Sequence, residues 1–326
     1  HVEAGLRSFD ITMPEELNRM AADACSLMYF IPTEESAINL LAEGISRKKL
    51  FITGNTVVDA CFRHLEIANK AGIQEESLAN LDIENMDNIL TLTMHRAENV
   101  DDKERLLNII SALKELKDMN IIFPIHPRTK KTLENFNLFD ELNELDNVHI
   151  IKPLGYLDFL ILTSHSTLIL TDSGGLQEEA ITLDVPVLTL RYNTERPETV
   201  SAGGNILVGA NKNNILENAE KILNDEEFAN KMKNAKNPYG KGDAAIKTID
   251  AIEEAYNNGL LDIKAPENIM SSFDRKMIKI NEDVSVKEFE ENENALVHMV
   301  FDGEKMIFPL NNLNLKGMMI TYDVYQ

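Results

Sequence analysis

Between residues 86 and 190, short apolar runs alternate with segments of helical periodicity. The apolar runs predict five strands, at 88–93, 121–125, 148–151, 168–171 and 187–190. Helices are predicted between them, at 104–113, 130–136, 156–162 and 176–181. The strands are apolar along their whole length, as parallel strands are when helices cover both faces of their sheet. This part of the chain therefore predicts a Rossmann-like α/β domain.

The first 65 residues show the same alternation over a shorter distance. They predict a helix, a strand, a second helix and a second strand, at 16–25, 27–31, 33–43 and 50–53. The segment 70–86 is poor in apolar residues, which is typical of a crossing between domains. We therefore expect residues 1–85 to be the remainder of an N-terminal Rossmann-like domain with its crossing segment, and 86–262 to be a C-terminal one.

After residue 262 the pattern changes to β-type runs. Two of them, 295–301 and 304–310, flank Asp302-Gly303, a dipeptide favoured in two-residue hairpin turns. A further strand is expected within 316–325. Residues 263–326 are therefore expected to form a small β-rich appendage.

Composition narrows the class of protein. The 326 residues are 44% hydrophobic and 26% charged, as in soluble globular proteins of two or three domains. The net charge of −22 argues against nucleic acid as a partner, and an anionic ligand needs a local cationic site. Apolar runs are too short to cross a bilayer, so we expect no membrane partner. Cys25 and Cys61 lack the spacing of a metal site and are expected to be buried, reduced thiols of a cytoplasmic protein.

The clearest candidate for chemistry is the stretch from Leu170 to Ala180, which predicts a strand, a glycine pair and a helix. Ser173 suits the N-cap of that helix. Gly174 and Gly175 allow an anion such as a diphosphate to approach the backbone N–H groups at the helix start. Glu179 lies further along the helix, where it can accept hydrogen bonds from ribose hydroxyls. A tight turn with a capped helix is the simpler alternative, and the segment alone leaves the two open.

Other polar side chains follow the predicted strands. His95 lies directly after the first strand, where an imidazole can contact a phosphate or carry a proton. His126 has the same position one strand later and competes with it. Arg191 and Arg196 are the local cations after a further strand. The turn-rich loop 237–243 is either a lid or a connection.

Carboxylates gather near the start of the chain. Glu3 follows His-Val, which is typical of a strand end, and precedes Gly5. Pro14 begins a helix, so Glu15 and Glu16 fall in its first turn. Acids in that position commonly compensate the helix dipole, which is the structural alternative to a catalytic role.

Taken together, six motifs resemble those of the non-hydrolysing UDP-N-acetylglucosamine (UDP-GlcNAc) 2-epimerases in order and spacing. They are His1–Arg7, Pro14–Arg19, Phe51–Asp59, Thr171–Ala180, Thr194–Glu198 and Asn237–Gly240. The resemblance covers residues 1 to about 255 and implies a GT-B-like α/β fold. Such a fold has two Rossmann-like domains with the active site in the cleft between them. The first domain is expected to be incomplete here, because the family has further residues ahead of the position of His1.

The resemblance also implies a reaction. UDP-GlcNAc and UDP-N-acetylmannosamine (UDP-ManNAc) are interconverted by elimination of UDP to 2-acetamidoglucal and re-addition, without a metal or other cofactor, in a cytoplasmic homodimer. It assigns Glu3, Glu15 and His95 to catalysis, with His95 on the nucleotide phosphate. Substrate-binding roles fall to Ser173, Gly174 and Gly175 at the diphosphate, Glu179 at the ribose, Arg196 at a phosphate or the sugar, and Phe159 beside the uracil.

Three alternatives remain at this point. A hydrolysing UDP-GlcNAc 2-epimerase and a GT-B UDP-sugar glycosyltransferase share the sheet, the glycine pair and the ribose carboxylate. The third alternative is a UDP-sugar-binding module without turnover.

Overall fold

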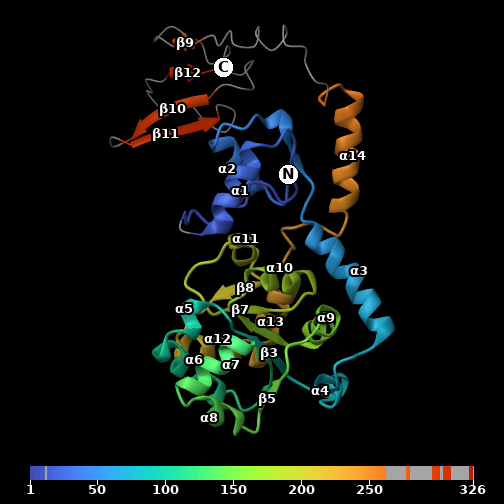
Figure 1. Cartoon of the computed structure of the whole chain (residues 1–326), viewed down its shortest axis with the longest axis vertical. Helices are drawn as coiled ribbons and strands as arrows, with labels where there is room; N and C mark the ends of the chain where they lie inside the picture. The colour runs from blue at the N-terminus through green and yellow to red at the C-terminus, as the bar shows by residue number, and fades with distance from the viewer. Residues whose placement is uncertain (12, 262–276, 280–295, 302–303, 310–322, 326) are drawn as a thin grey trace. The chain divides into compact units, whose positions relative to one another are not determined.

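A computed structural model describes residues 1–11, 13–261, 277–279, 296–301, 304–309 and 323–325 (Figure 1). The chain divides into two compact units. Unit 1 comprises His1–Gly54 together with Ala245–Gln326, and unit 2 comprises Asn55–Ala244. Each unit is described by itself below.

Unit 2 is built on a six-stranded parallel sheet. Its strands are β3 (Ile89–Thr93), β4 (Asn120–Pro124), β5 (Val148–Ile151), β6 (Leu168–Thr171), β7 (Val187–Thr189) and β8 (Asn205–Leu207). They lie in the order β5-β4-β3-β6-β7-β8, with every neighbouring pair parallel. The five strands predicted from the sequence are confirmed, and β8 is an additional one. The order reverses between β3 and β6, which is where ligands bind in sheets of this kind.

Successive side chains of a strand point to opposite faces of the sheet. Because both sets are apolar here, helices cover both faces. Leu90 and Leu92 of β3 join one apolar cluster, whereas Ile89 joins another. The first cluster is closed by α6 (Lys103–Glu115), α7 (Pro127–Asn135), α8 (Phe139–Asn143), α12 (Lys212–Asn224) and α13 (Glu226–Lys233). The opposite face is covered by α3 (Thr56–Ala71), α9 (Tyr156–His165) and α10 (Gly174–Thr182). The four helices predicted between the strands are thus confirmed as α6, α7, α9 and α10.

The chain between α3 and β3 packs onto unit 2. Leu78 of α4 (Glu76–Ala79) and Ile83 of η2 (Ile83–Asn85) are buried with Ala68 and Ile89. The remaining short helices of the unit are α5 (Ala97–Val100) and α11 (Pro197–Ser201). Contacts therefore place residues 55–85 with unit 2, whereas the sequence pattern assigns 1–85 to the first domain. The assignment of these segments to functional domains stays a prediction.

Unit 1 contains a parallel pair of strands, β1 (Tyr29–Ile31) and β2 (Leu50–Ile52). Its helices are α1 (Pro14–Ala24), α2 (Glu34–Ala42), η1 (Arg47–Lys49) and most of α14 (Ala244–Asn257). One apolar cluster joins Tyr29 and Ile31 to Leu40 of α2, and another joins Phe30 to Ala251 of α14. The predicted alternation of helix and strand over the first 53 residues is confirmed.

The C-terminal region contains β9 (Met277–Lys279), β10 (Leu296–Phe301), β11 (Glu304–Pro309) and β12 (Asp323–Tyr325) in the order β11-β10-β12-β9. Phe301 pairs antiparallel with Glu304, which confirms the hairpin predicted around Asp302-Gly303. Only the end of the strand expected within 316–325 falls on described residues, as β12. The rest of the predicted appendage, residues 263–326, lies outside the described residues, and its extent stays a prediction.

The two cysteines differ in environment. Cys61 on α3 is buried, and burial raises the pKa of its thiol to about 12. Cys25, at the end of α1, is exposed, so the expectation that both thiols are buried is wrong. The reason lies in α1, which buries the polar Glu16 and Asp23 while Leu17 and Met20 are exposed. Among the described residues, every helix is too short or too polar to cross a membrane.

Candidate functional site

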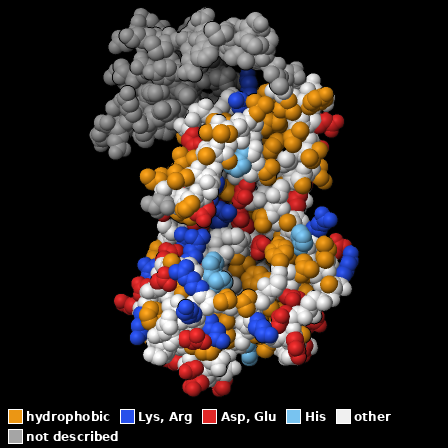
Figure 2. Space-filling model, in the orientation of Figure 1, with side chains coloured by type: hydrophobic (Ala, Val, Ile, Leu, Met, Phe, Trp, Pro, Cys, Tyr) orange, Lys and Arg blue, Asp and Glu red, His pale blue; other side chains and the backbone are white. Residues whose placement is uncertain are grey.

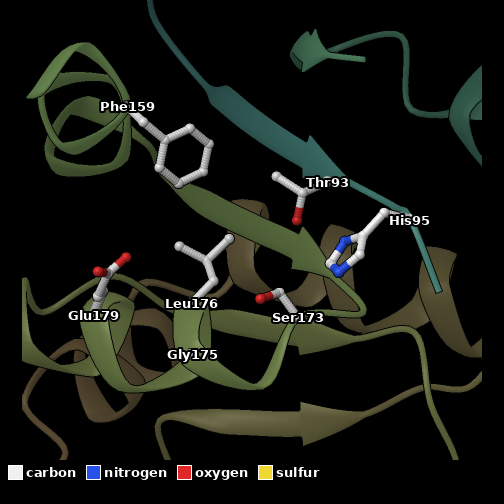
Figure 3. Close-up of a pocket in the computed structure, with 7 residues that line it drawn as sticks. All are labelled: Thr93, His95, Phe159, Ser173, Gly175, Leu176 and Glu179. Carbon is white, nitrogen blue, oxygen red and sulfur yellow. The ribbon is translucent and has the colours of Figure 1, made fainter. Parts of the chain in front are cut away.

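A pocket of about 320 Å³ opens in unit 2 at the carboxyl ends of β3 and β6 (Figure 3). It lies at the reversal of strand order, because β3 leads into its histidine and β6 into its glycine turn. In Figure 3 the polar groups of Thr93, His95 and Ser173 gather at one end, and Glu179 and Phe159 lie toward the other. The complete lining is Thr93, His95, Phe159, Ser173, Gly175, Leu176 and Glu179.

The start of α10 forms one wall of the pocket. Gly174 and Gly175 are its first two residues, so their N–H groups belong to the first turn of the helix. Gly175 is exposed, and a Cβ there would meet none of the described atoms within 4 Å. Ser173 occupies the N-cap position as predicted, but its side chain makes no capping hydrogen bond within the described chain. Its hydroxyl belongs to the pocket lining instead, where it can contact an anion at the helix start.

His95 is held by a carboxylate that the sequence interpretation missed. Asp172 is fully buried, and its carboxylate accepts hydrogen bonds from the backbone N–H groups of His95 and Arg96 and from Nδ2 of Asn99. The Nδ1 atom of His95 lies 3.2 Å from Oδ1 of Asp172. Burial opposes ionisation of Asp172, but these hydrogen bonds and the charge of His95 hold its pKa below the ordinary value. The sequence feature that could have indicated this role is the position of Asp172 between the end of β6 and Ser173-Gly-Gly.

His126 begins α7 at the N-cap, where its Nδ1 accepts a hydrogen bond of 3.2 Å from the backbone N–H of Arg128. Its ring centroid lies 6.4 Å from that of His95. The structure therefore brings the two histidines together, with His95 in the described lining of the pocket and His126 outside it. His95 remains the candidate for contact with a ligand.

An aromatic side chain and a carboxylate complete the pocket. Phe159, in α9, and Glu179, in α10, both line it, so two separate helices contribute to the same cavity. Tyr156 lies one turn before Phe159, and its hydroxyl donates a hydrogen bond to the Glu179 carboxylate. Burial raises the pKa of Glu179, and the hydrogen bond from Tyr156 partly opposes that increase. Sequence reasoning missed Tyr156, because its position in an apolar helix gave no sign of a polar contact.

Arg191 is used inside the protein. Its Nε lies 2.8 Å from Oε1 of Glu98, and its Nη1 lies 3.0 Å from Oε2 of Glu195. Arg96 approaches the same Glu195 at 3.4 Å. Burial favours the neutral form of Glu195, but the two arginines hold its pKa below the ordinary value. Arg191 therefore has two carboxylate partners within the protein and is absent from the described lining of the pocket, so its contact with a ligand stays a prediction.

Arg196 also has an internal partner. Its Nε lies 2.8 Å from Oε1 of the buried Glu178, which additionally accepts a hydrogen bond from Nδ2 of Asn55. Arg196 is absent from the described lining of the pocket, so its contact with a phosphate or the sugar stays a prediction. The nearby loop 237–243 is a packed connection rather than a lid, since Tyr239 is fully buried and its hydroxyl lies 3.4 Å from Glu198.

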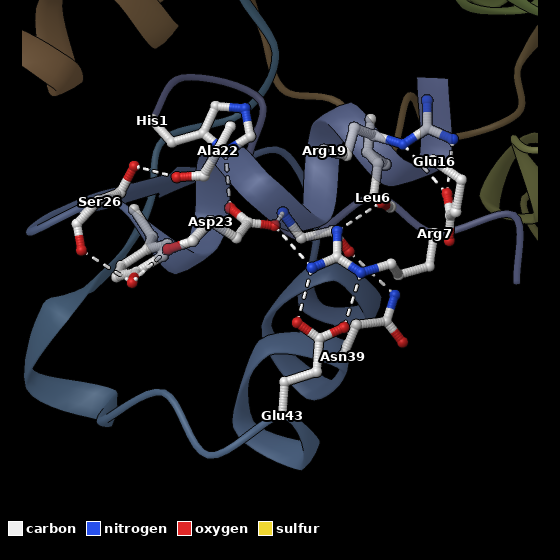
Figure 4. A network of polar contacts seen from close by, with 12 residues as sticks. His1, Leu6, Arg7, Glu16, Arg19, Ala22, Asp23, Ser26, Asn39 and Glu43 are labelled. Carbon is white, nitrogen blue, oxygen red and sulfur yellow. Dashed lines mark hydrogen bonds and ion pairs between the residues drawn. The ribbon is translucent and has the colours of Figure 1, made fainter. Parts of the chain in front are cut away.

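The candidate carboxylates Glu3 and Glu15 belong to unit 1. Glu15 is exposed in the first turn of α1, and Glu3 is half-buried with a φ of 66°. Glu16 is structural, because its carboxylate accepts the N–H groups of Ser8 and Phe9 at 3.0 and 3.1 Å and pairs with Arg19 (Figure 4). Since the pocket belongs to unit 2, the catalytic roles of Glu3 and Glu15 stay predictions.

The surface charge is uneven on the face seen in Figure 2. Basic and histidine side chains gather over α5, whereas acidic side chains predominate near α8. Arg96, the residue before α5, lies near the start of α10, since its Nη2 would be 3.9 Å from a Cβ at Gly174. An acidic protein thus presents local positive charge where an anionic ligand would approach. Among the described residues, no group of three or more His, Cys, Asp and Glu side chains is arranged to hold a metal ion.

Comparison with known proteins points in one direction. The sequence model of the family described as UDP-N-acetylglucosamine 2-epimerase matches residues 1–253. A UDP-N-acetylglucosamine 2-epimerase of Methanocaldococcus jannaschii is 51% identical over 252 residues, covering 76% of this chain and 67% of the relative. The enzyme of that name from Escherichia coli K12 is 38% identical over 263 residues, covering 78% and 68%.

Solved structures agree with the sequence comparison. The M. jannaschii 2-epimerase in complex with UDP-GlcNAc and UDP superposes with a TM-score of 0.66 at 49% identity, covering 78% of this chain and 68% of that one. The Neisseria meningitidis 2-epimerase bound to UDP-GlcNAc gives a TM-score of 0.67 at 38% identity, covering 78% and 69%. This chain belongs to the UDP-N-acetylglucosamine 2-epimerase family.

Proposed function

We propose that this protein interconverts UDP-GlcNAc and UDP-ManNAc as a non-hydrolysing 2-epimerase. The observation that carries the proposal is the start of α10, where Ser173 and Gly175 face the same pocket as His95 and Glu179. That arrangement offers backbone N–H groups and an imidazole to a diphosphate, and a carboxylate to a sugar hydroxyl. The 51% identity to the M. jannaschii 2-epimerase supports the same reaction.

In this proposal the nucleotide lies along the pocket. The diphosphate binds at Ser173, Gly174 and Gly175, with His95 donating to it from the ring nitrogen opposite Asp172. Glu179 accepts hydrogen bonds from the ribose hydroxyls, and Phe159 packs beside the uracil. The relatives from M. jannaschii and N. meningitidis were solved with UDP-GlcNAc bound, which supports this choice of ligand.

The chemistry starts from a C2 proton that is not acidic, because no carbonyl group is adjacent to it. Elimination avoids this difficulty. A base removes the C2 proton, a C1–C2 double bond forms, and the C1–O bond breaks with its electron pair leaving on UDP. The product is 2-acetamidoglucal. Re-addition of UDP at C1, with a proton delivered to the other face of C2, gives the epimer. We assign these proton transfers to Glu3 and Glu15.

Departure of UDP places negative charge on the diphosphate. The first turn of α10 and the His95 imidazole are positioned to stabilise that charge as it develops, since both face the pocket. Asp172 supports His95 in this task by holding the imidazole through Nδ1. The functional unit is proposed to be a cytoplasmic homodimer. Light scattering coupled to size-exclusion chromatography tests the dimer, because it gives the molar mass of the protein in solution.

Product analysis distinguishes the related activities. Chromatography of UDP-GlcNAc incubated with the protein should show UDP-ManNAc, and incubation of UDP-ManNAc should reach the same mixture. Irreversible release of free ManNAc and UDP would instead identify a hydrolysing enzyme. Consumption of UDP-GlcNAc only in the presence of a sugar acceptor would identify a glycosyltransferase. Binding of UDP without any turnover would identify a binding module.

A further inference from the structure

Glu3 has an unusual backbone conformation. Its φ of 66° lies in the left-handed region, which residues other than glycine, asparagine and aspartate seldom adopt. Such a conformation persists only where the surroundings impose it, and residues held in this way cluster at functional sites. The groups that impose it are therefore of interest for the function of the side chain.

One set of contacts holds the chain on the strand side of Glu3. Val2 forms a parallel bridge with Phe30, and the Phe30 N–H donates to the His1 carbonyl at 2.9 Å. Directly after Glu3, the Ala4 N–H donates to the Phe30 carbonyl at 3.1 Å. Glu3 thus lies between two residues that both pair with Phe30 of β1, and it adopts its left-handed φ between them.

The next residue, Gly5, is held by side chains of two helices. Its carbonyl accepts a hydrogen bond of 3.0 Å from Nδ2 of Asn39, and its N–H donates to Oδ2 of Asp23 at 3.3 Å. Its φ is 79°, and a Cβ at this position would lie 2.3 Å from the Ser36 carbonyl oxygen. Only glycine fits here, so the path of the chain after Glu3 is closely specified.

Asp23 belongs to a charged cluster with Arg7 and Glu43, in which Arg7 and Asp23 are buried and Glu43 is exposed (Figure 4). The Nη2 atom of Arg7 lies 2.6 Å from Oδ2 of Asp23 and 2.7 Å from Oε2 of Glu43, and its Nε lies 2.7 Å from Oε1 of Glu43. Its Nη1 donates to the Leu6 carbonyl at 2.8 Å. Arg7 and Asp23 are 7% and 1% exposed. Desolvation offsets much of the attraction in a buried ion pair such as Arg7–Asp23, so stability alone is a weak explanation for that pair.

We infer that Arg7, Asp23 and Glu43 are positioning residues for Glu3, acting through the backbone of Gly5 and Leu6. Asp23 fixes the N–H of Gly5, and Arg7 fixes the carbonyl of Leu6. Glu43 fixes the orientation of Arg7 by accepting two of its N–H groups. The inference rests on the proposed role of Glu3 in proton transfer.

The test measures kcat, UDP affinity and melting temperature for Glu43→Gln and Arg7→Lys. Each change is conservative in shape and weakens the cluster without deleting a side chain. We expect kcat to fall about 10- to 100-fold, as small displacements of reacting groups do. UDP affinity should stay within about twofold, because the proposed nucleotide pocket belongs to unit 2. Glu35→Gln, which removes an exposed carboxylate from the same α2, is the matched control and should retain the original kcat.

The outcomes separate the inference from the proposed function. If Glu3→Gln abolishes turnover while Glu43→Gln and Arg7→Lys keep the original kcat, the positioning role is overturned. A parallel loss of kcat, UDP affinity and melting temperature would overturn it too, because the cluster would then serve the fold. Full turnover by Glu3→Gln would remove Glu3 itself from the mechanism. Absence of UDP-ManNAc formation by the unchanged protein would overturn the proposed function.

Discussion

The Nδ1 atom of His95 lies 3.2 Å from the carboxylate Oδ1 of Asp172, and the carboxylate is fully buried. Because the same carboxylate accepts the backbone N–H groups of His95 and Arg96, it fixes both the main chain and the ring. The opposite nitrogen, Nε2, then remains for a ligand in the pocket. This pair links the fold of the sheet edge to the chemistry proposed for the site.

Replacing Asp172 with asparagine tests this link. The pKa of Asp172 is below its ordinary value, so its charge contributes stability above about pH 3.8 that is lost as the pH falls through the folded-state pKa. Asp172→Asn should therefore lower the free energy of unfolding at neutral pH by about 1–3 kcal/mol, measured by urea titration. It should also lower kcat. The control Asp101→Asn, at an exposed ion pair with Arg128, should change stability by about 0.5 kcal/mol or less. Equal stability of both variants would contradict the account.

Alanine substitutions at the two glycines that begin α10 should affect different quantities, the melting temperature at Gly174 and the UDP affinity at Gly175. A Cβ at Gly174 would lie 3.0 Å from Oε2 of Glu195, which Arg191 and Arg96 hold in place, so Gly174→Ala should lower the melting temperature. Gly175 has open space on the pocket side, so Gly175→Ala should keep the melting temperature and weaken UDP binding. Thermal unfolding and calorimetry with UDP measure both quantities. Unchanged UDP affinity in Gly175→Ala would place the diphosphate elsewhere.

Tyr156→Phe tests whether Tyr156 positions the Glu179 carboxylate, which is proposed to bind the ribose. The change removes the hydroxyl that donates to Glu179, so affinity for UDP should fall about tenfold while affinity for 2′,3′-dideoxy-UDP stays the same. The groups beside Glu179 are Tyr156 on α9 and Cys61 on α3, and His64 contacts the tyrosine ring. Burial raises the pKa of Glu179 and Tyr156 opposes this. In the variant, UDP affinity should therefore be lost at a higher pH as the solution is acidified. Equal losses for both nucleotides would indicate a purely structural tyrosine.

Arg196→Ala should affect both stability and binding. Glu178 is 3% exposed, and loss of the arginine leaves its charge without the ion pair, at a cost of about 3–5 kcal/mol in the free energy of unfolding. Adding Glu178→Gln should recover part of that loss. The proposed phosphate contact further implies a loss of about 1.5–3 kcal/mol in UDP binding. Urea titration and calorimetry separate the two effects. A loss of stability with unchanged UDP affinity would leave Arg196 with its structural role only.

Much of unit 2 follows from the sequence because its pattern is simple. The strands of the sheet are continuous apolar runs, and Ser-Gly-Gly after such a run marks both a turn and an anion site. Ser173, Gly175 and Glu179 were accordingly found from the pattern, and the structure places them on one pocket. The pattern of apolar and polar residues does not indicate which charged side chains form ion pairs with each other. Arg191 and Arg196, for example, pair with Glu195 and Glu178, and the sequence shows the two cations without showing these partners.

The polar interior of unit 1 shows a second limit of sequence reasoning. Burial was inferred from apolar character, yet α1 buries Glu16 and Asp23 and exposes Leu17. These carboxylates are buried because arginines and backbone N–H groups satisfy them, which periodicity cannot express. Asp172 is the same case in unit 2, a buried acid within the motif Thr171–Ala180. Asp172 contacts His95 in unit 2, and Asp23 accepts the N–H of Gly5, two residues after Glu3, in unit 1.

The central claim is that the C2 proton of the substrate is exchanged during epimerisation. Incubating UDP-GlcNAc with the protein in deuterated water and recording proton NMR and mass spectra measures this directly. The account predicts UDP-ManNAc carrying deuterium at C2, with deuterium also appearing at C2 of the recovered UDP-GlcNAc. Formation of UDP-ManNAc that retains the original C2 proton would contradict the account. Recovery of UDP-GlcNAc with no deuterium at C2 and no UDP-ManNAc formed would contradict it too.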